Sequence, residues 1–496
     1  MASSPTDAAV ALTRLGLGAR PGEIDRVAAD PRGWAMGQIR SQGAPQPSGQ
    51  FADTAERVAQ YIDYQSDAGL VRRDRRAAAP ATAEAAPFPA PGMADAADPQ
   101  AVARREARQA ARRDITQDTA QEFLARAQLG ATTDDGFAER WALFWSNALT
   151  VSAAKFASGA FVGQYEREAI RPHVFGRFED LVLAAEQHPA MLLYLDQARS
   201  VGPDSLAGAR RNAGLNENLA REMMELHTVG ADGGYTQTDV TELARALTGW
   251  SIPAARDQRQ PNRPRRARNM AAQAEPGPDG FVFRANVHEP GARTVMGKTY
   301  PAAGLAQGQA ILRDLARHPA TAKRLSRRLA AHFVADDPPP ALVARLETAW
   351  TGSGGDLAQV ARALIDAPET WTPQPAKIKT PHDFIVSAHR ALGTRPQRVQ
   401  PLRQALLDMG QPPFAPPSPE GWPDTAADWA GPDALVKRLN WSRTAADLAQ
   451  ASDPNAVAAS ALGPRLGERT RLAVARAESR PEALTLLFMS PEFQRR

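Results

Sequence analysis

The sequence predicts a mainly α-helical fold, a single large multi-helix domain with one small β-hairpin and two disordered insertions. Through most of the chain, apolar residues recur at the period of a helix that buries one face. A strand-like pattern occurs in one short region, and two stretches contain almost no large apolar residues. The sequence has no strand followed by a glycine-rich loop and a helix, so a nucleotide-binding fold is disfavoured.

All parts of the chain are predicted to belong to this one domain. The stretches 72–114 and 253–280 are rich in Ala, Arg and Pro and cannot bury enough apolar surface to offset the entropy lost on ordering. We therefore predict that both are disordered insertions, and solvated linkers rather than anion-binding tails. The chain then divides into an N-terminal helical part, the first insertion, central helices with an acidic and histidine-containing cluster, the second insertion, and a hairpin with the C-terminal helices, over 1–71, 72–114, 115–252, 253–280 and 281–496.

The best-defined helices lie in the second half of the chain. Leu325, Leu329 and Phe333 are four residues apart, which predicts one buried stripe. Thr351–Gly355, with the sequence TGSGG, predicts a helix end, and Asp356 is placed to cap the next helix.

One β-hairpin is predicted. Phe281–Arg284 and Thr294–Tyr300 are rich in β-branched and aromatic residues, and they flank a turn-rich HEPGA loop. We expect these two segments to pair with each other.

Charge and composition limit the classes of function. The 59 basic and 55 acidic side chains give a net charge of only +4, and they are interleaved, which disfavours nucleic-acid binding. The chain has no cysteine, so disulfides, thiolate nucleophiles and thiolate metal sites are excluded. No apolar run approaches the ~18 residues of a membrane span, and the N-terminus lacks a signal peptide, so we expect a cytoplasmic location.

The segment Asn216–Gly234, NENLAREMMELHTVGADGG, carries the densest cluster of ionisable groups. At about 100° per residue, Glu217, Arg221 and Glu225 form one ridge, while His227 falls on the apolar side. The simpler interpretation is a solvated charge ladder with a core histidine that bonds a carbonyl near the helix end. The spacing of the residues, taken alone, favours this simpler interpretation.

The alternative interpretation is that this helix forms the wall of a site. A second segment, Tyr165–His173, also carries a carboxylate and an imidazole, Glu168 and His173. If the two segments pack together, their carboxylates and imidazoles could bind a divalent metal or divide into acid and base roles. The spacing matches neither HExxH nor the Glu-x-x-His of di-iron bundles.

Several motifs resemble one bacterial family. They are RLGLGARPGEIDR, YEREAIRPHVFGRFEDL, HPAMLLYLD, the acidic segment with its continuation to LTGW, HEPGARTVMGKTY, PPSPEGWP and RLNW, in this order. Together they resemble the family catalogued as domain of unknown function 1800 over nearly the whole chain. The resemblance implies no defined activity. It implies a sulfatase-like partner protein, because members are often encoded beside such a family, and with it an exported or envelope-associated role.

The resemblance also points to individual positions. The family pattern keeps Glu217, Asn218, Arg221, Glu222, Glu225 and His227, together with Glu168, Arg171, His173 and His288. One departure concerns the pattern FW-x-N-His-Phe, where this chain has Ala148 after Asn147, so a family histidine is missing. A second departure is Glu289, where the family usually has Asp.

The remaining histidines are predicted to be structural. His318, His332, His382 and His389 are scattered along helices without a common motif. Trp422 lies in a proline-rich loop that could cover a cleft, although simple loop packing is favoured.

Two functions stay open. The first is an enzyme, a hydrolase with or without a divalent metal, that uses a carboxylate–histidine pocket. The second is a non-catalytic helical binding or assembly protein that supports the sulfatase-like partner. The candidate catalytic residues are Glu222, Glu225, His227, Arg221, His173 and Glu168, and further candidates are Glu217, Asn218, Asn147 and His288.

Overall fold

The computed structural model describes residues 4–211 except 78–98, and residues 214–496 except 255–256, 258–273 and 450–451. Helices dominate these residues. The first half contains α1 Pro5–Val10, α2 Glu23–Val27, α3 Pro31–Met36, α4 Thr54–Ala77, α5 Pro99–Thr132, α6 Gly136–Ala148, α7 Phe156–Gly159, α8 Val162–Gln164, α9 Phe178–Gln187, α10 Pro189–Tyr194, α11 Gly208–Arg211, α12 Asn218–Glu222 and α13 Gln237–Leu247.

The second half contains a longer series of helices, from α15 to the C-terminus. These are α15 Leu305–Arg317, α16 Pro319–Phe333, α17 Pro340–Ser353, α18 Leu357–Asp366, α19 Pro381–Ala391, α20 Val399–Asp408, α21 Ala426–Trp429, α22 Pro432–Leu448, α23 Pro454–Leu462, α24 Glu468–Ala475, α25 Arg480–Phe488 and α26 Pro491–Gln494. Short π- or 3-10 turns complete the described helices: η1 Ala11–Leu15, η2 Tyr165–Ile170, η3 Arg171–His173, η4 Gln197–Arg199, η5 Met223–His227, η6 Ala285–Val287, η7 Pro368–Trp371 and η8 Gly463–Arg465.

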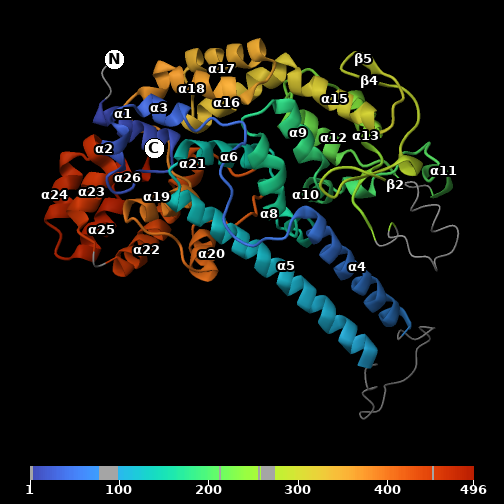
Figure 1. Cartoon of the computed structure of the whole chain (residues 1–496), viewed down its shortest axis with the longest axis horizontal. Coiled ribbons are helices and arrows are strands. Elements are labelled where there is room, and N and C mark those ends of the chain that lie inside the picture. Colours follow the sequence, from blue (N-terminus) through green and yellow to red (C-terminus); the bar gives the residue numbers. More distant parts are fainter. Residues whose placement is uncertain (1–3, 78–98, 212–213, 255–256, 258–273, 450–451) are drawn as a thin grey trace.

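The helices form a body from which one helical pair projects. Figure 1 shows α15–α18 along one edge of the body, and the C-terminal helices α22–α25 beside α1 and α2. The larger hydrophobic core lies among α6, α9, α10, α13 and α15–α18, and a second core joins α5 to α19, α20 and the C-terminal helices. The predicted mainly α fold is confirmed.

The predicted helix stripe and caps are confirmed. Leu325, Leu329 and Phe333 are buried in the larger core. Gly354 ends α17 in the left-handed region with φ 66°, which glycine adopts without steric cost. Asp356 caps α18 by accepting hydrogen bonds from the backbone N–H groups of the helix's first turn.

The first predicted insertion is too wide. Residues 72–77 belong to α4 and residues 99–114 to α5, and the two helices pack side by side as they extend from the body (Figure 1). The physical reason is propensity, because Ala and Arg are strong helix formers even where large apolar residues are few. Residues 78–98 lie outside the described part of the chain.

The second predicted insertion also contains regular structure. β2, Ala274–Pro276, lies inside 253–280 and pairs with β3. The rest of this prediction falls largely on residues 255–256 and 258–273, which lie outside the described residues.

The pairing predicted for the hairpin is wrong. β3, Val282–Arg284, pairs with β1, Trp250–Ser251, and with β2, while β4, Arg293–Val295, pairs with β5, Lys298–Tyr300. The hairpin therefore lies within TVMGKTY. Met296 and Gly297 both have positive φ, 46° and 77°, which is the geometry of a two-residue turn that matches strand twist.

Candidate functional site

The exposed ridge of the acidic segment is a surface network. Arg221 Nη2 lies 3.2 Å from Glu217 Oε2 and 2.9 Å from Gln237 Oε1, and Glu217 also accepts a hydrogen bond of 2.7 Å from Thr241. Asn218, the residue after Glu217, is exposed. These contacts join α12 to α13, and they confirm the first step of the predicted charge ladder.

His227 lies in the closed interior. Its side chain is fully buried at the end of η5, and Nδ1 is 2.5 Å from Oε1 of Glu186, which is equally buried in the last turn of α9. The prediction that this imidazole bonds a backbone carbonyl is wrong, because its partner is a carboxylate from a distant segment.

Three of the predicted site residues share this neighbourhood. Burial raises the pKa of Glu222, the nearby His227 lowers it, and the charges of Glu225 and Glu186 raise it further. Glu222 in turn adds to the effect of burial, which raises the pKa of Tyr194 to about 12. Glu222, Glu225 and His227 thus lie within electrostatic reach of one another.

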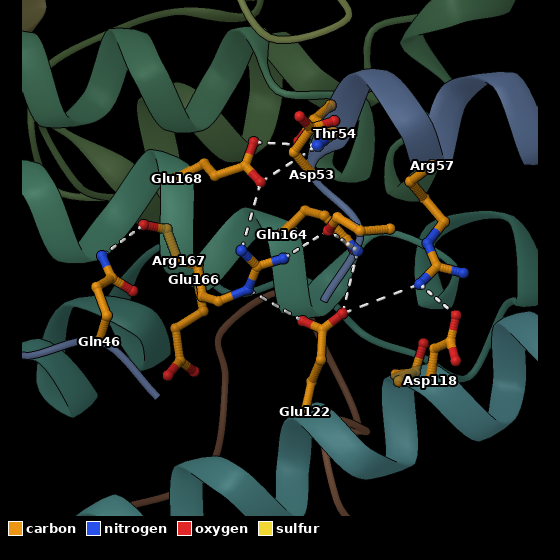
Figure 2. Close-up of polar contacts among 12 residues, drawn as sticks. Gln46, Asp53, Thr54, Arg57, Asp118, Glu122, Gln164, Glu166, Arg167 and Glu168 are labelled. Carbon is orange, nitrogen blue, oxygen red and sulfur yellow. Dashed lines mark hydrogen bonds and ion pairs between the residues drawn. The ribbon is translucent and has the colours of Figure 1, made fainter. Parts of the chain in front are cut away.

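Glu168 and His173 have other neighbours. Figure 2 shows Glu168 beside Thr54 at the start of α4, and both of its carboxylate oxygens lie 3.2 Å from the Thr54 backbone nitrogen. Burial raises the pKa of Glu168, and burial lowers the pKa of His173, with Asp279 close to both. Glu168 and His173 therefore have different neighbours from the group of Glu222, Glu225 and His227.

A buried ion network joins α5 to η2. In Figure 2, Glu122 of α5 faces Gln164 at 3.0 Å, Arg167 at 3.4 Å and Arg57 at 3.9 Å. Burial raises the pKa of Glu122 to about 7 despite these cations. The network ties α4, α5 and η2 together.

Arg171, a position of the family pattern, belongs to a second buried network. Its guanidinium bonds Glu139 at 2.7 Å and Glu166 at 2.6 Å, and Arg126 bonds the other oxygen of Glu166 at 2.7 Å. The pKa of Glu166 would be raised by burial, but these arginines lower it to about 2.

Beside this network lies a hollow of about 110 Å³, which we call the central cavity. It is bounded by α6, η2, α16, α19 and the loop 411–424. Its polar lining residues include Arg126, Arg140, Ser146, Asn147, Tyr165, Glu166, His332, His382, Asp383 and Asp424.

His332 and Asp424 form an oriented pair in the cavity wall. Nδ1 of His332 lies 2.7 Å from Oδ2 of Asp424, and the Phe144 ring packs against the imidazole with centroids 5.3 Å apart. Burial lowers the pKa of His332 to about 4, although Asp424 opposes the shift. Burial alone would raise the pKa of Asp424, but His332, Arg496 and Lys377 together lower it to about 2. The imidazole is neutral and the carboxylate ionised at neutral pH.

His382 contributes a second imidazole. Its pKa is lowered to about 3, first by burial and then by the charge of Arg126. The adjacent Asp383 is held by Arg140 at 3.0 Å and by Arg496 at 3.3 Å. His382 is therefore neutral beside a fixed ion cluster.

Apart from Arg126 Nε, three polar atoms of the cavity wall are buried without a hydrogen-bond partner among the described residues. They are Ser146 Oγ, His332 Nε2 and His382 Nε2. Buried polar groups are normally paired with protein or ordered water. Three unpaired polar atoms around one cavity therefore indicate a binding site for a polar ligand.

Asn147 holds the loop that closes the cavity. Its Nδ2 donates to the Trp422 carbonyl at 3.0 Å, and its Oδ1 accepts from the Trp422 N–H at 2.7 Å. Trp422 also lines the cavity, so the loop both packs against α6 and covers the cavity. Asn147 is the one residue of the predicted set among the described lining residues, and Ala148, where the family histidine is missing, is buried in the larger core.

Sequence reasoning missed the two histidines of the cavity. His332 and His382 lie on unrelated helices, and Asp424 is 92 residues from His332, so no local motif links them. His288, a further candidate, donates from Nδ1 to the Thr248 carbonyl at 2.8 Å and packs on Phe283.

Two general features complete the site. Over the described ranges, no group of three or more His, Asp or Glu residues is arranged to hold a metal ion. In the same part of the chain, none of the helices is both long and apolar enough to cross a membrane.

Comparison with known proteins gives a family but no activity. A family model described as a protein of unknown function, DUF1800, matches residues 10–495. No curated protein and no solved structure matches the chain.

Proposed function

This chain belongs to the DUF1800 family, and we propose that it is a hydrolase whose reaction takes place in the central cavity. One observation carries the proposal. Two neutral, buried imidazoles, His332 and His382, each have an unpaired Nε2 at the same hollow, and Asp424 orients one of them. The proposed reactive centre is still a pocket of carboxylates and histidines, but its residues are not those of the acidic segment Asn216–Gly234.

His332 acts as the general base. Its Nδ1–H donates to Asp424, which leaves the lone pair on Nε2 free to accept a proton. The attacking group that loses this proton is a water molecule or the Ser146 hydroxyl. Asp424 fixes the tautomer and stabilises the imidazolium that forms, as the carboxylate does in hydrolase triads.

The other polar groups bind and stabilise. His382 supplies a hydrogen bond to the substrate, because its Nε2 has no other partner among the described residues. Arg126 and Arg140 line the same cavity and are fixed by Glu166 and Asp383, so their field acts without reorganisation on negative charge that develops in the transition state.

The test is a panel of chromogenic carboxylic esters, phosphate esters and anilides. His332→Gln and Asp424→Asn should each lower kcat/KM for the accepted class at least about 100-fold, the usual contribution of a positioned base. His389→Gln is the control, because His389 bonds Thr394 and does not line the cavity. Wild-type rates in both cavity variants would reject the proposal. If Glu222→Gln lowers kcat/KM instead, the reaction takes place in the neighbourhood of His227.

The alternative is a non-catalytic binding protein for a sulfatase-like partner. The observation that favours it is the pair α4 and α5, which projects from the body as an arm (Figure 1). Replacing the exposed Arg105 and Glu106 on the arm by Ala should then weaken partner capture without changing hydrolysis. Unchanged capture would argue against this role for the arm.

A further inference from the structure

A second hollow shares the lining residue Phe414 with the central cavity. It measures about 250 Å³ and is walled by apolar side chains of α5, α7, α20 and the segment 412–415. Ile115, Phe123, Phe156 and Leu407 are among the residues of this wall, and Phe414 lines both hollows. An apolar cavity of roughly 150 Å³ already holds a benzene ring, so this one has room for a larger hydrocarbon group.

The apolar cavity opens into a basic groove. A depression of about 700 Å³ between α5 and α20 shares Thr116, Ala120 and Arg403 with it. Arg112 and Arg113 line the groove, and the Arg112 guanidinium lies 5.0 Å over the Phe156 ring, at the junction of the two hollows.

The charge of this groove is uncompensated. The described lining of the two hollows contains three arginines and neither Asp nor Glu. None of the three guanidinium groups takes part in an ion pair with a carboxylate of the described chain. Some arginines elsewhere in the described chain are paired with carboxylates, as Arg171 is with Glu139.

We propose that this continuous hollow, the amphiphile groove, binds a medium-chain carboxylate. The hydrocarbon chain lies in the apolar cavity, where it replaces contact with water by contact with Phe123 and Phe156. The carboxylate accepts charge-assisted hydrogen bonds from Arg112, Arg113 or Arg403 at the groove. A hollow of this size fits a hydrocarbon chain and not a helix, whose diameter with side chains is about 10 Å.

Phe414 separates this site from the central cavity. It has φ 51°, a conformation that aromatic residues rarely adopt, and it is held by the Ala153 N–H, which donates to its carbonyl at 2.7 Å. Its ring stacks edge-on against Phe123 with centroids 5.3 Å apart. The two hollows are thus distinct, and the binding inference does not depend on the proposed reaction.

The experiment is titration calorimetry of the full chain with decanoate and with decanol, below their aggregation concentrations. Decanoate should bind saturably with one site per chain and at least about ten times more tightly than decanol. The double variant Arg112→Gln, Arg403→Gln should lose at least about tenfold in affinity for decanoate and leave decanol unchanged.

Occupying the cavity gives the matched test. Ala120→Leu should weaken both ligands, whereas Ala107→Leu, at an exposed position of the same helix, should weaken neither. Thr116→Phe provides a second occupying variant if Ala120→Leu lowers the melting temperature. Equal affinity for decanoate and decanol, equal losses in the two alanine variants, or no saturable binding by the wild type would overturn the assignment.

Discussion

At the scale of single residues, burial decides what each ionisable group can do. His227 and Glu186 are sealed against each other, with neither side chain exposed, whereas Arg221 is 41% exposed on the opposite side of the same segment. Breaking a buried hydrogen-bonded pair leaves a polar group without its partner, whereas an exposed pair contributes little. Neighbouring residues of one motif therefore have unequal energetic roles.

The first prediction follows from this contrast. His227→Ala should lower the free energy of unfolding by about 3 kcal/mol, because Glu186 stays buried without its partner. Arg221→Ala should cost less than about 1 kcal/mol, since its contacts are open to water. Urea unfolding of the two variants measures both values. Similar large losses would mean that the surface network of Glu217 is as important as the buried pair.

The second prediction concerns pH. In the unfolded chain His382 has a pKa of 6.5, and in the folded chain the value is about 3, so the native state binds fewer protons between these values. The contribution of neutral His382 to stability is complete above pH 6.5 and is lost as pH falls towards 3. Between pH 7 and pH 5 this single group should cost about 2 kcal/mol. Between pH 7 and pH 5, His382→Gln should therefore lose about 2 kcal/mol less of its free energy of unfolding than the wild type does. Urea unfolding at the two pH values measures this difference. Parallel pH profiles would contradict it.

At the scale of elements, the covering loop depends on one glycine. Gly421 has φ 95°, and a Cβ there would lie 2.5 Å from the Asn147 carbonyl oxygen. The loop can therefore approach α6 closely enough for Asn147 to bond both polar groups of the Trp422 backbone.

The third prediction separates backbone strain from contact. Gly421→Ala should lower stability by about 2–3 kcal/mol and weaken ligand binding in the central cavity, because the loop must move away from Asn147. Gly410→Ala is the control, since Gly410 has a similar φ of 87° with no atom within 4 Å of its Cβ position. Gly410→Ala should lower the free energy of unfolding by only about 1 kcal/mol, because only the backbone conformation is unfavourable for alanine there. Equal melting temperatures for the two variants would show that the close approach is unimportant.

Local chemistry was predictable for the elements, and long-range pairing was not. The cap at Asp356 and the stripe of Leu325 follow from the residues within one turn, and both were predictable. The partner of β3 was not, since three short segments compete for it and no residue in the strand distinguishes them. The same holds for the cavity, where Asn147 was named from its motif but His332 needs Asp424 from a distant loop.

At the scale of the whole molecule, Arg496 supports residues of the cavity wall from the C-terminal segment. Arg496 is 1% exposed, and its guanidinium reaches Asp383 at 3.3 Å and Asp424 at 3.5 Å. It also donates to the His332 carbonyl at 2.8 Å, while its backbone pairs with Lys377. Arg496 therefore helps to neutralise the two carboxylates that hold His332 and Arg140 of the cavity wall.

The last prediction tests this long-range support. Arg496→Ala should lower the free energy of unfolding by about 3–5 kcal/mol, because two buried carboxylates lose a shared cation. The same change should raise the pKa of Asp424, since the positive charge of Arg496 helps to lower it, and so weaken the orientation of His332 at acidic pH. Arg495→Ala is the control, because Arg495 is exposed one residue earlier and should cost less than about 1 kcal/mol. Urea unfolding measures both variants, and NMR titration of the His332 imidazole reports the state of its partner. An Arg496→Ala protein as stable as the control would mean that Arg140 and Lys377 alone suffice to hold Asp383 and Asp424 ionised.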